Sequence, residues 1–132
     1  MTFLRRVLKV QAALWALTGV LLAVAPAFTL DTLLGQPVPV EGAWLRMLGV
    51  MSIVLALFMV LVSQHTAETW WWAWGFAILE VGVATVSILN ALLGVPEGAS
   101  AVPWWAIGIG AMLFGALDLI GIARAGEEKP IG

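Results

Sequence analysis

The stretch WWWAWGFAILEVGVATVSILNALL, residues 70–93, is apolar apart from one carboxylate, Glu80, near its middle. A strip of small side chains recurs every three or four residues and includes this acid: Ala73, Ala77, Glu80, Ala84, Ser87 and Ala91. The opposite face is bulky: Trp72, Phe76, Leu79, Val83 and Val86. In a membrane, small residues let helices approach closely and polar residues turn inward. The stretch is therefore predicted to be a transmembrane helix that carries Glu80 into a helix interface.

The whole chain has the composition of a membrane protein. Of its 132 residues 62% are hydrophobic and 11% are charged, and the mean hydropathy is +1.04. About 20 apolar residues cross roughly 30 Å of hydrocarbon, and four such runs nearly fill the chain. The sequence predicts one all-α domain over residues 1–132, an integral membrane antiparallel four-helix bundle. Its helices are expected at about 3–24, 44–62, 70–93 and 102–123, followed by a short mobile tail.

Several classes of site are excluded by residue type. The chain has no cysteine, which removes disulfides, thiolate catalysis and cysteine-bound metals. Its one histidine, His65, cannot hold a haem between two imidazoles within one copy. Six dispersed basic residues and a net charge of −2 make nucleic acid an unsuitable partner. No metal, cofactor or catalytic pair is expected, so the chain is predicted not to be an enzyme.

The N-terminal segment has features of a secretory signal peptide, with a basic start and the small-residue pattern Ala23-Val24-Ala25. The apolar run is nevertheless long enough to span a membrane from Val7 onward, and Pro26 follows where cleavage would fall. We therefore predict that this segment is the first transmembrane helix.

Basic residues predict the orientation in the membrane. Those at the two termini are Arg5, Arg6, Lys9, Arg124 and Lys129, whereas the opposite side offers Arg46. Because positive charge is enriched on the cytoplasmic side, both termini are predicted to be cytoplasmic in a bacterial inner membrane. Tryptophans should form an inner belt (Trp70, Trp71, Trp72, Trp74) and an outer belt (Trp44, Trp104, Trp105), with Trp15 deep in the membrane. In the outer loop, Leu30, Leu33 and Leu34 fit either a helical turn resting on the membrane surface or an irregular loop.

Small residues also mark the packing faces of the other helices. The second helix carries Gly49, Ser52, Ala56 and Ser63, and the fourth carries Gly108, Ala111 and Gly115 in line with Asp118. With Ala77 and Ala84 of the third helix, these residues are expected to let the helices pack closely. A further small pair, Ala106 and Gly110, follows the same rule.

Polar residues within the helices fall into three depth layers when residues are counted at 1.5 Å each. Near the cytoplasmic side lie Lys9, Gln11 and Asp118, near the middle lie Glu80, Ser52, Thr18 and Trp15, and near the outer side lie Arg46 and Asn90. An ion pair of Asp118 with Lys9, or a hydrogen bond with Gln11, is favoured over a transport role for that acid. Arg46 and Asn90 are expected to bind one another.

Glu80 has no basic residue at its predicted depth, and an unpaired carboxylate in hydrocarbon is strongly disfavoured. One hypothesis is that it is protonated and donates to Ser52, Thr18 or a backbone carbonyl as structural glue. The other is that it forms a proton or cation site. Trp15 has two interpretations as well, since it either fills space or lines a small apolar pocket that could take a pigment, quinone or lipid.

Two motifs carry a resemblance. The segment WLRMLGV (residues 44–50) contains Arg46 and Gly49 after a proline-containing loop, and ALDLIGIAR (residues 116–124) contains Asp118 and Arg124. The layout from Pro26 to Arg124 resembles a diffuse group of short bacterial four-helix membrane proteins that are loosely similar to DoxX-like proteins. The resemblance implies a four-helix bundle and little about activity.

The sequence favours one function and leaves a second as the alternative. The first is a non-enzymatic structural or accessory subunit that associates through helix faces with itself or with a larger membrane complex. The second is a small proton-linked transporter or channel that uses Glu80, with Asp118 and Arg46 along the path.

Overall fold

The computed structural model describes residues 1–129, and every regular element within that range is a helix. In chain order these are α1 (Thr2–Val24), α2 (Pro26–Phe28), η1 (Thr29–Leu33), α3 (Ala43–Gln64), α4 (Thr66–Thr69), η2 (Trp70–Trp72), α5 (Ala73–Leu93) and α6 (Val102–Glu128). Four spans are long and apolar enough to cross a membrane: Thr2–Val24, Ala43–Gln64, Thr66–Leu93 and Val102–Glu128. The predicted all-α fold is confirmed, and its apolar helices indicate a membrane protein.

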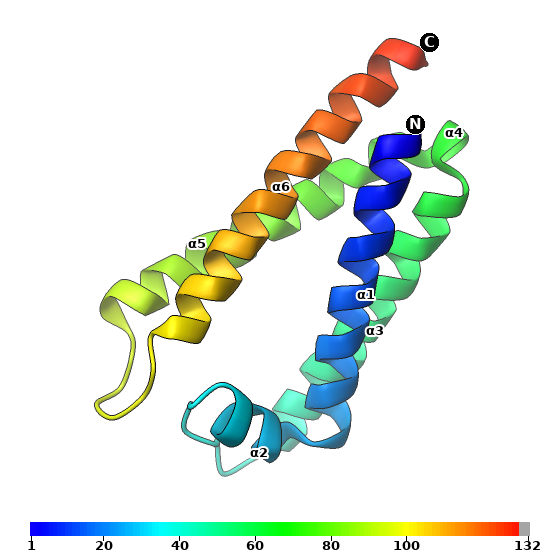
Figure 1. The fold of residues 1–132 in the computed structure, drawn as a ribbon. Coiled ribbons are helices and arrows are strands. Elements are labelled where there is room, and N and C mark those ends of the chain that lie inside the picture. The colour runs from blue at the N-terminus through cyan, green and yellow to red at the C-terminus, as the bar shows by residue number, and fades with distance from the viewer. Residues whose placement is uncertain (130–132) are drawn as a thin grey trace.

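The long helices form two antiparallel hairpins, α1 with α3 and α5 with α6. Figure 1 shows that the hairpins meet near the two chain termini and diverge toward the opposite end, so that the molecule has the outline of a V. We call these the joined end and the open end. The α4 connection lies at the joined end, and the α2–η1 segment and the loop of residues 94–101 lie at the open end.

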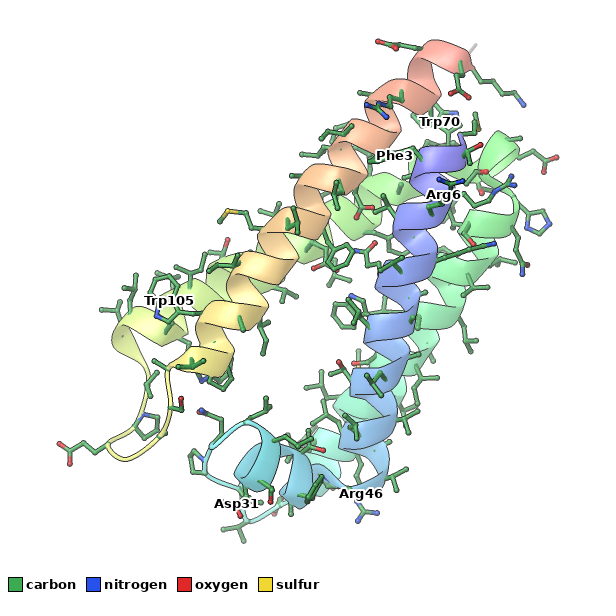
Figure 2. The ribbon with its side chains drawn as sticks, viewed as in Figure 1. Phe3, Arg6, Asp31, Arg46, Trp70 and Trp105 are labelled. Carbon is green, nitrogen blue, oxygen red and sulfur yellow. The ribbon has the colours of Figure 1, made fainter. Side chains whose placement is uncertain are left out.

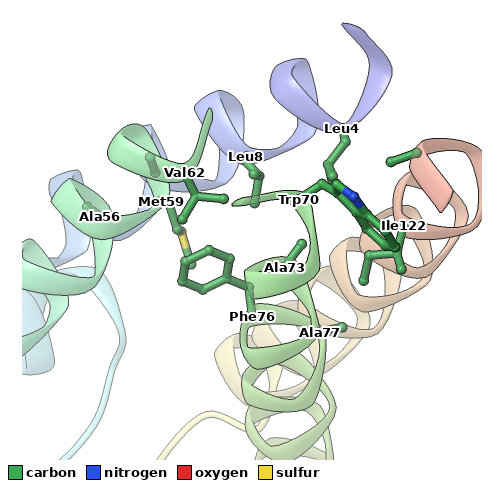
Figure 3. Packing of buried hydrophobic residues seen from close by; sticks show 12 residues of the cluster. Leu4, Leu8, Ala56, Met59, Val62, Trp70, Ala73, Phe76, Ala77 and Ile122 are labelled. Carbon is green, nitrogen blue, oxygen red and sulfur yellow. The ribbon is translucent and has the colours of Figure 1, made fainter. Parts of the chain in front are cut away.

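An apolar cluster holds the joined end together, and we call it the joint. Its buried members are Leu4, Leu8, Ala12, Ala56, Met59, Val62, Trp70, Ala73, Phe76, Ala77, Ile122 and Ala125. These residues come from all four long helices and from η2, and Figure 3 shows them filling the space where the helices cross. The hairpins are therefore fastened to each other mainly by side-chain packing at one end.

One residue of α5 lies on a different face from the one predicted. Phe76 was expected on the bulky outward face, but it is 3% exposed and packs in the joint. Its ring stands edge-on to that of Phe58 in α3, with 5.6 Å between the ring centroids. Because the hairpins splay, α5 meets α3 near the joined end, and Phe76 fills the wedge between them.

Close approach within each hairpin depends on small residues, as the sequence predicted. Gly49, Ala77, Ala84, Gly108, Ala111 and Gly115 are buried as predicted. The prediction for Ala106 and Gly110 is wrong, because both line an open space between the hairpins. Between α1 and α3, a Cβ atom added to Gly49 would lie 2.5 Å from the backbone nitrogen of Ala23. One added to Gly19 would lie 2.7 Å from the carbonyl oxygen of Gly49. The backbones of the two helices thus touch at this pair of glycines.

The last helix is longer than predicted. It was expected to end near residue 123, but α6 continues to Glu128. The added turn is held because Ala125 is buried in the joint and the amino group of Met1 lies 2.7 Å from the Glu128 carboxylate. The end of the predicted mobile tail, residues 130–132, lies outside the described residues.

At the open end, a polar contact joins the two outer loops, and we call it the clasp. Gln36 Nε2 donates to the carbonyl oxygens of Ser100 at 2.7 Å and Leu34 at 3.1 Å. Trp104 Nε1 donates in turn to Gln36 Oε1 at 3.0 Å. Of the two forms considered for the outer loop, the helical one is observed, in α2 and η1. The V is therefore fastened at its wide end as well, by hydrogen bonds instead of packing.

Candidate functional site

A cavity of about 470 Å³ lies between the hairpins. Its walls come from α1, α5 and α6, and the η1 segment covers it toward the open end. The lining side chains are mainly apolar: Leu14, Leu21, Leu33, Leu34, Val83, Ala106, Ile107, Ala111 and Phe114. Polar groups come from Gln11, Trp15, Thr18, Thr29 and Glu80. A cavity of this size and lining is typical of sites for small, largely apolar molecules.

Glu80 forms the polar floor of this cavity together with two residues of α1. Gln11 Nε2 donates to Glu80 Oε1 at 2.6 Å, and Trp15 Nε1 donates to the same oxygen at 2.9 Å. Gln11 and Trp15 are four residues apart, so α1 presents both on one face. The arrangement joins α1 to α5 by two hydrogen bonds to a single oxygen.

The second oxygen of Glu80 is left open to the cavity. Oε2 accepts no hydrogen bond from the described residues. Oε2 is also not fully enclosed by protein. The fully enclosed polar atoms without a partner in residues 1–129 are Gln11 Oε1 and both carboxyl oxygens of Asp118. Because Glu80 lines the cavity and Oε1 is engaged, a proton or a ligand at this acid has its place on Oε2.

Asp118 lies behind this floor. It is 0% exposed, and neither carboxyl oxygen has a hydrogen-bond partner among residues 1–129. It lies three residues along α6 from Gly115, where an added Cβ atom would be 3.5 Å from Glu80. A second acid is thus enclosed beside Glu80, and it accepts no hydrogen bond from the described residues.

The predicted ion pair between Lys9 and Asp118 is wrong. Lys9 is exposed on α1, whereas Asp118 is enclosed, and the salt bridge found within residues 1–129 joins Met1 to Glu128. Lys9 and Gln11 are two residues apart and therefore point to different sides of the helix. Gln11 turns inward and Lys9 turns outward.

The predicted partners of Glu80 are wrong as well. Ser52 donates to the carbonyl oxygen of Leu48 in its own helix, and Thr18 lines the cavity without a bond to the acid. Ser52 cannot serve Glu80 because α3 packs behind α1, away from the middle of α5. The depth count placed Gln11 one layer too far from Glu80, since it ignored the length of the amide and carboxyl side chains.

Arg46 and Asn90, which were expected to bind one another, form no hydrogen bond within residues 1–129. Arg46 is exposed near the open end, as Figure 2 shows, and Asn90 lies on the other hairpin. The splay of the hairpins is greatest there, so residues at equal depth are far apart. Depth alone therefore did not identify neighbours at the open end.

The tryptophans divide between surface and interior. Trp15, whose role was left open, lines the cavity and binds Glu80. Trp70, expected in the inner belt, is buried in the joint, and Trp104 takes part in the clasp. The remaining five are exposed: Trp44, Trp71, Trp72, Trp74 and Trp105.

Two features of the site were not predicted: the bonds of Gln11 and Trp15 to Glu80, and the clasp at Gln36. A signal for the first was available, because Gln11 and Trp15 are donors spaced one turn apart in an apolar helix. The clasp had no such signal, since it depends on how two loops meet in space. Within residues 1–129, no three histidine or acidic side chains gather as metal ligands would.

Compared with known proteins, the chain matches no family model, no curated protein and no solved structure. The resemblance to DoxX-like proteins therefore stays a prediction. What the arrangement can do chemically is bind a small apolar molecule beside an acid that can gain or lose a proton.

Proposed function

We propose that this protein is a small proton-linked membrane transporter in which Glu80 carries the proton and the cavity takes the substrate. The observation that carries the proposal is the open oxygen of Glu80, which faces a cavity within the membrane-spanning part of the molecule. Ionisable residues at such depth mark proton and substrate paths in membrane proteins. A purely structural acid would gain more by engaging both of its oxygens.

The surroundings of Glu80 support proton exchange in both directions. On one side the acid meets the cavity, which extends toward the open end as far as η1. On the other side lie Gln11, which donates to Glu80, and Asp118, which follows Gly115 on α6 toward the joined end. A proton leaving Oε2 can thus move into the cavity on the open side, and a second acid lies on the side toward the joined end. With the basic termini in the cytoplasm, the joined end would face inward and the open end outward.

Infrared titration of the full chain in lipid vesicles tests the proposal without a known substrate. A transporter needs Glu80 to release its proton and take it up again within the pH range in which the protein stays folded. We expect a carboxyl band that is lost as the pH rises and that is missing in the Glu80→Gln variant. Glu97→Gln, which removes an exposed loop acid, is the matched control and should keep the band. A Glu80 band that persists unchanged across this range would refute the transport role.

A role as an accessory subunit is the second candidate, and one observation favours it. Gly75 and Gly82 lie on an outer face of α5 with open space where a side chain would be. A helix of another subunit could approach closely there. Purification in mild detergent tests this: a stoichiometric partner that is lost in Gly82→Leu but kept in Glu80→Gln would favour the accessory role.

A further inference from the structure

We infer that the cavity takes a lipophilic organic cation with a single positive charge, whose charged group lies at Glu80 Oε2 and whose apolar body fills the space beyond. This inference rests on the proposed transport role, because it names the substrate class of the same site. Three observations support it: the charges around the cavity, the nature of its walls and the oxygen of Glu80 that accepts no hydrogen bond.

No positively charged side chain lines the cavity. On α1, Lys9 is exposed and Arg5 donates to Thr66 at the joined end, and on α3 Arg46 is exposed near the open end. The acids nearby are Glu80 on α5 and the enclosed Asp118 on α6, while Asp31 in η1 is exposed. An ionised Glu80 therefore lacks a counter-charge from the described residues, and a cationic ligand supplies it.

The walls select against small hydrated ions. Apart from the floor and two threonines, the lining is aliphatic or aromatic, so a bare metal ion would lose its water without gaining ligands. Glu80 offers one open oxygen, whereas hard cations require several. An organic cation has its charge spread over an apolar surface, so leaving water costs it less.

Aromatic rings complete the fit. Trp15 and Phe114 both line the cavity, and the faces of such rings attract organic cations. Gln11 lines it too, is 1% exposed, and its Oε1 has no hydrogen-bond donor in the described structure. This oxygen is fully enclosed, so the charged group of the ligand meets Glu80 Oε2 and not Gln11. A neutral ligand would not neutralise the charge of an ionised Glu80, and an anion would be repelled by it.

The step that couples ligand to proton is a simple exchange. Protonated Glu80 loses the proton from Oε2, the carboxylate that forms pairs with the cation, and one proton is released for each monovalent cation bound. Charge and atoms balance without a further reactant. The same exchange in reverse returns the ligand when a proton arrives from the other side of the membrane.

Calorimetry on the full chain in lipid nanodiscs tests the inference, with empty nanodiscs subtracted for partition into lipid. The probes are tetraphenylphosphonium and the smaller benzyltrimethylammonium, and tetraphenylborate is the control of similar shape and opposite charge. We expect at least one cation to bind wild-type protein with release of about one proton, measured by comparing two buffers of different ionisation enthalpy. Tetraphenylborate should show no binding beyond lipid.

Variants locate the site. Glu80→Gln should weaken cation binding at least tenfold and abolish proton release, whereas Glu97→Gln should leave both unchanged. Gly110→Leu should also weaken binding, because it fills open space in the cavity wall without touching the acid. This variant keeps the test valid if Glu80→Gln folds poorly. Circular dichroism shows which variants are folded.

Three results would overturn the inference: no binding of either cation, equal binding of tetraphenylborate, or unchanged affinity in both Glu80→Gln and Gly110→Leu. Infrared titration separates this failure from that of the proposed function. If Glu80 releases its proton but neither cation binds, the substrate class is wrong and proton-linked transport stands. If Glu80 keeps its proton throughout, both are wrong.

Discussion

The joined end and the open half of this protein use the same kinds of residue and reach opposite results. At the joined end, the small residues of α6 each receive a large side chain: a Cβ added to Gly121 would lie 2.8 Å from Leu4, and one added to Gly126 would lie 3.4 Å from Trp70. Toward the open end, Gly110 on the same helix has nothing within 4 Å of that position. Between the hairpins, small residues thus meet large side chains at the joined end and border a cavity in the open half, whereas within the α1–α3 hairpin Gly19 and Gly49 pack closely in the open half as well.

The difference shows that a strip of small residues permits two helices to approach closely but does not ensure that they do. Close approach needs a partner to fill the shape, as Leu4 does at Gly121. Where α1 presents Gln11 and Trp15 instead, the long polar side chains hold α5 by hydrogen bonds and the space beyond them stays open. The polar floor is therefore the boundary between the packed half and the open half.

The largest expected effect comes from a cavity made in the joint. Leu8 is 0% exposed, and Leu8→Ala should lower the free energy of unfolding by about 2 kcal/mol. The loss is smaller than in a water-soluble core, because unfolded helices in a micelle leave Leu8 in contact with detergent tails and not with water. Unfolding by sodium dodecyl sulfate, followed by circular dichroism, measures it.

Leu17→Ala is the matched control for this change. Leu17 lies on the same helix and is 59% exposed, so its truncation should alter stability by less than about 0.5 kcal/mol. Equal effects of the two substitutions would mean that the joint is no more tightly packed than the outer surface of α1.

The sequence alone was sufficient for the four long helices and for the small-residue strip of α5. The small strip of α5, with Ala77 and Ala84 beside Glu80, is buried as the spacing predicted. This succeeds because the period of a helix and the thickness of a membrane are fixed physical quantities. Every helix start and end within residues 1–120 lies within four residues of its predicted position, if α4 and η2 are taken as the lead into α5.

What the sequence could not supply is the angle between the hairpins. That angle depends on how Phe76, Met59 and Leu8 fill one wedge together, which no single helix determines. An error in the angle carries over to every contact between hairpins. It explains why the expected pair of Arg46 with Asn90 was wrong, although both residues were placed at the correct end of their helices.

A smaller effect is expected from opening the clasp. Gln36→Ala removes three hydrogen bonds, of which those with Ser100 and Trp104 join the two sides of the open end, and should lower stability by about 1 kcal/mol, since water replaces part of what is lost. Hydrogen exchange of the backbone amides in residues 94–101 should increase, while exchange in the joint should stay the same. Mass spectrometry of the deuterated protein measures both.

Gln64→Ala is the control for the clasp, because Gln64 is exposed at the joined end. It should leave exchange in the outer loops unchanged. If Gln36→Ala also left the outer loops unchanged, the open half would be held by something other than these hydrogen bonds, and the contrast with the joint would lose its basis.

The smallest effect is expected at Lys9, and it separates the two views of how Asp118 is accommodated. If the ion pair predicted from the sequence existed, removing either partner would strand a buried charge at a cost of several kcal/mol. In the structure Lys9 is exposed and Asp118 is enclosed, so Lys9→Gln should change stability by less than about 0.5 kcal/mol. A double-mutant cycle with Asp118→Asn should give a coupling near zero, measured by the same detergent unfolding. A coupling above about 1 kcal/mol would restore the ion pair. It would also place a positive charge beside the polar floor, where the inference of a cationic ligand requires that there be none.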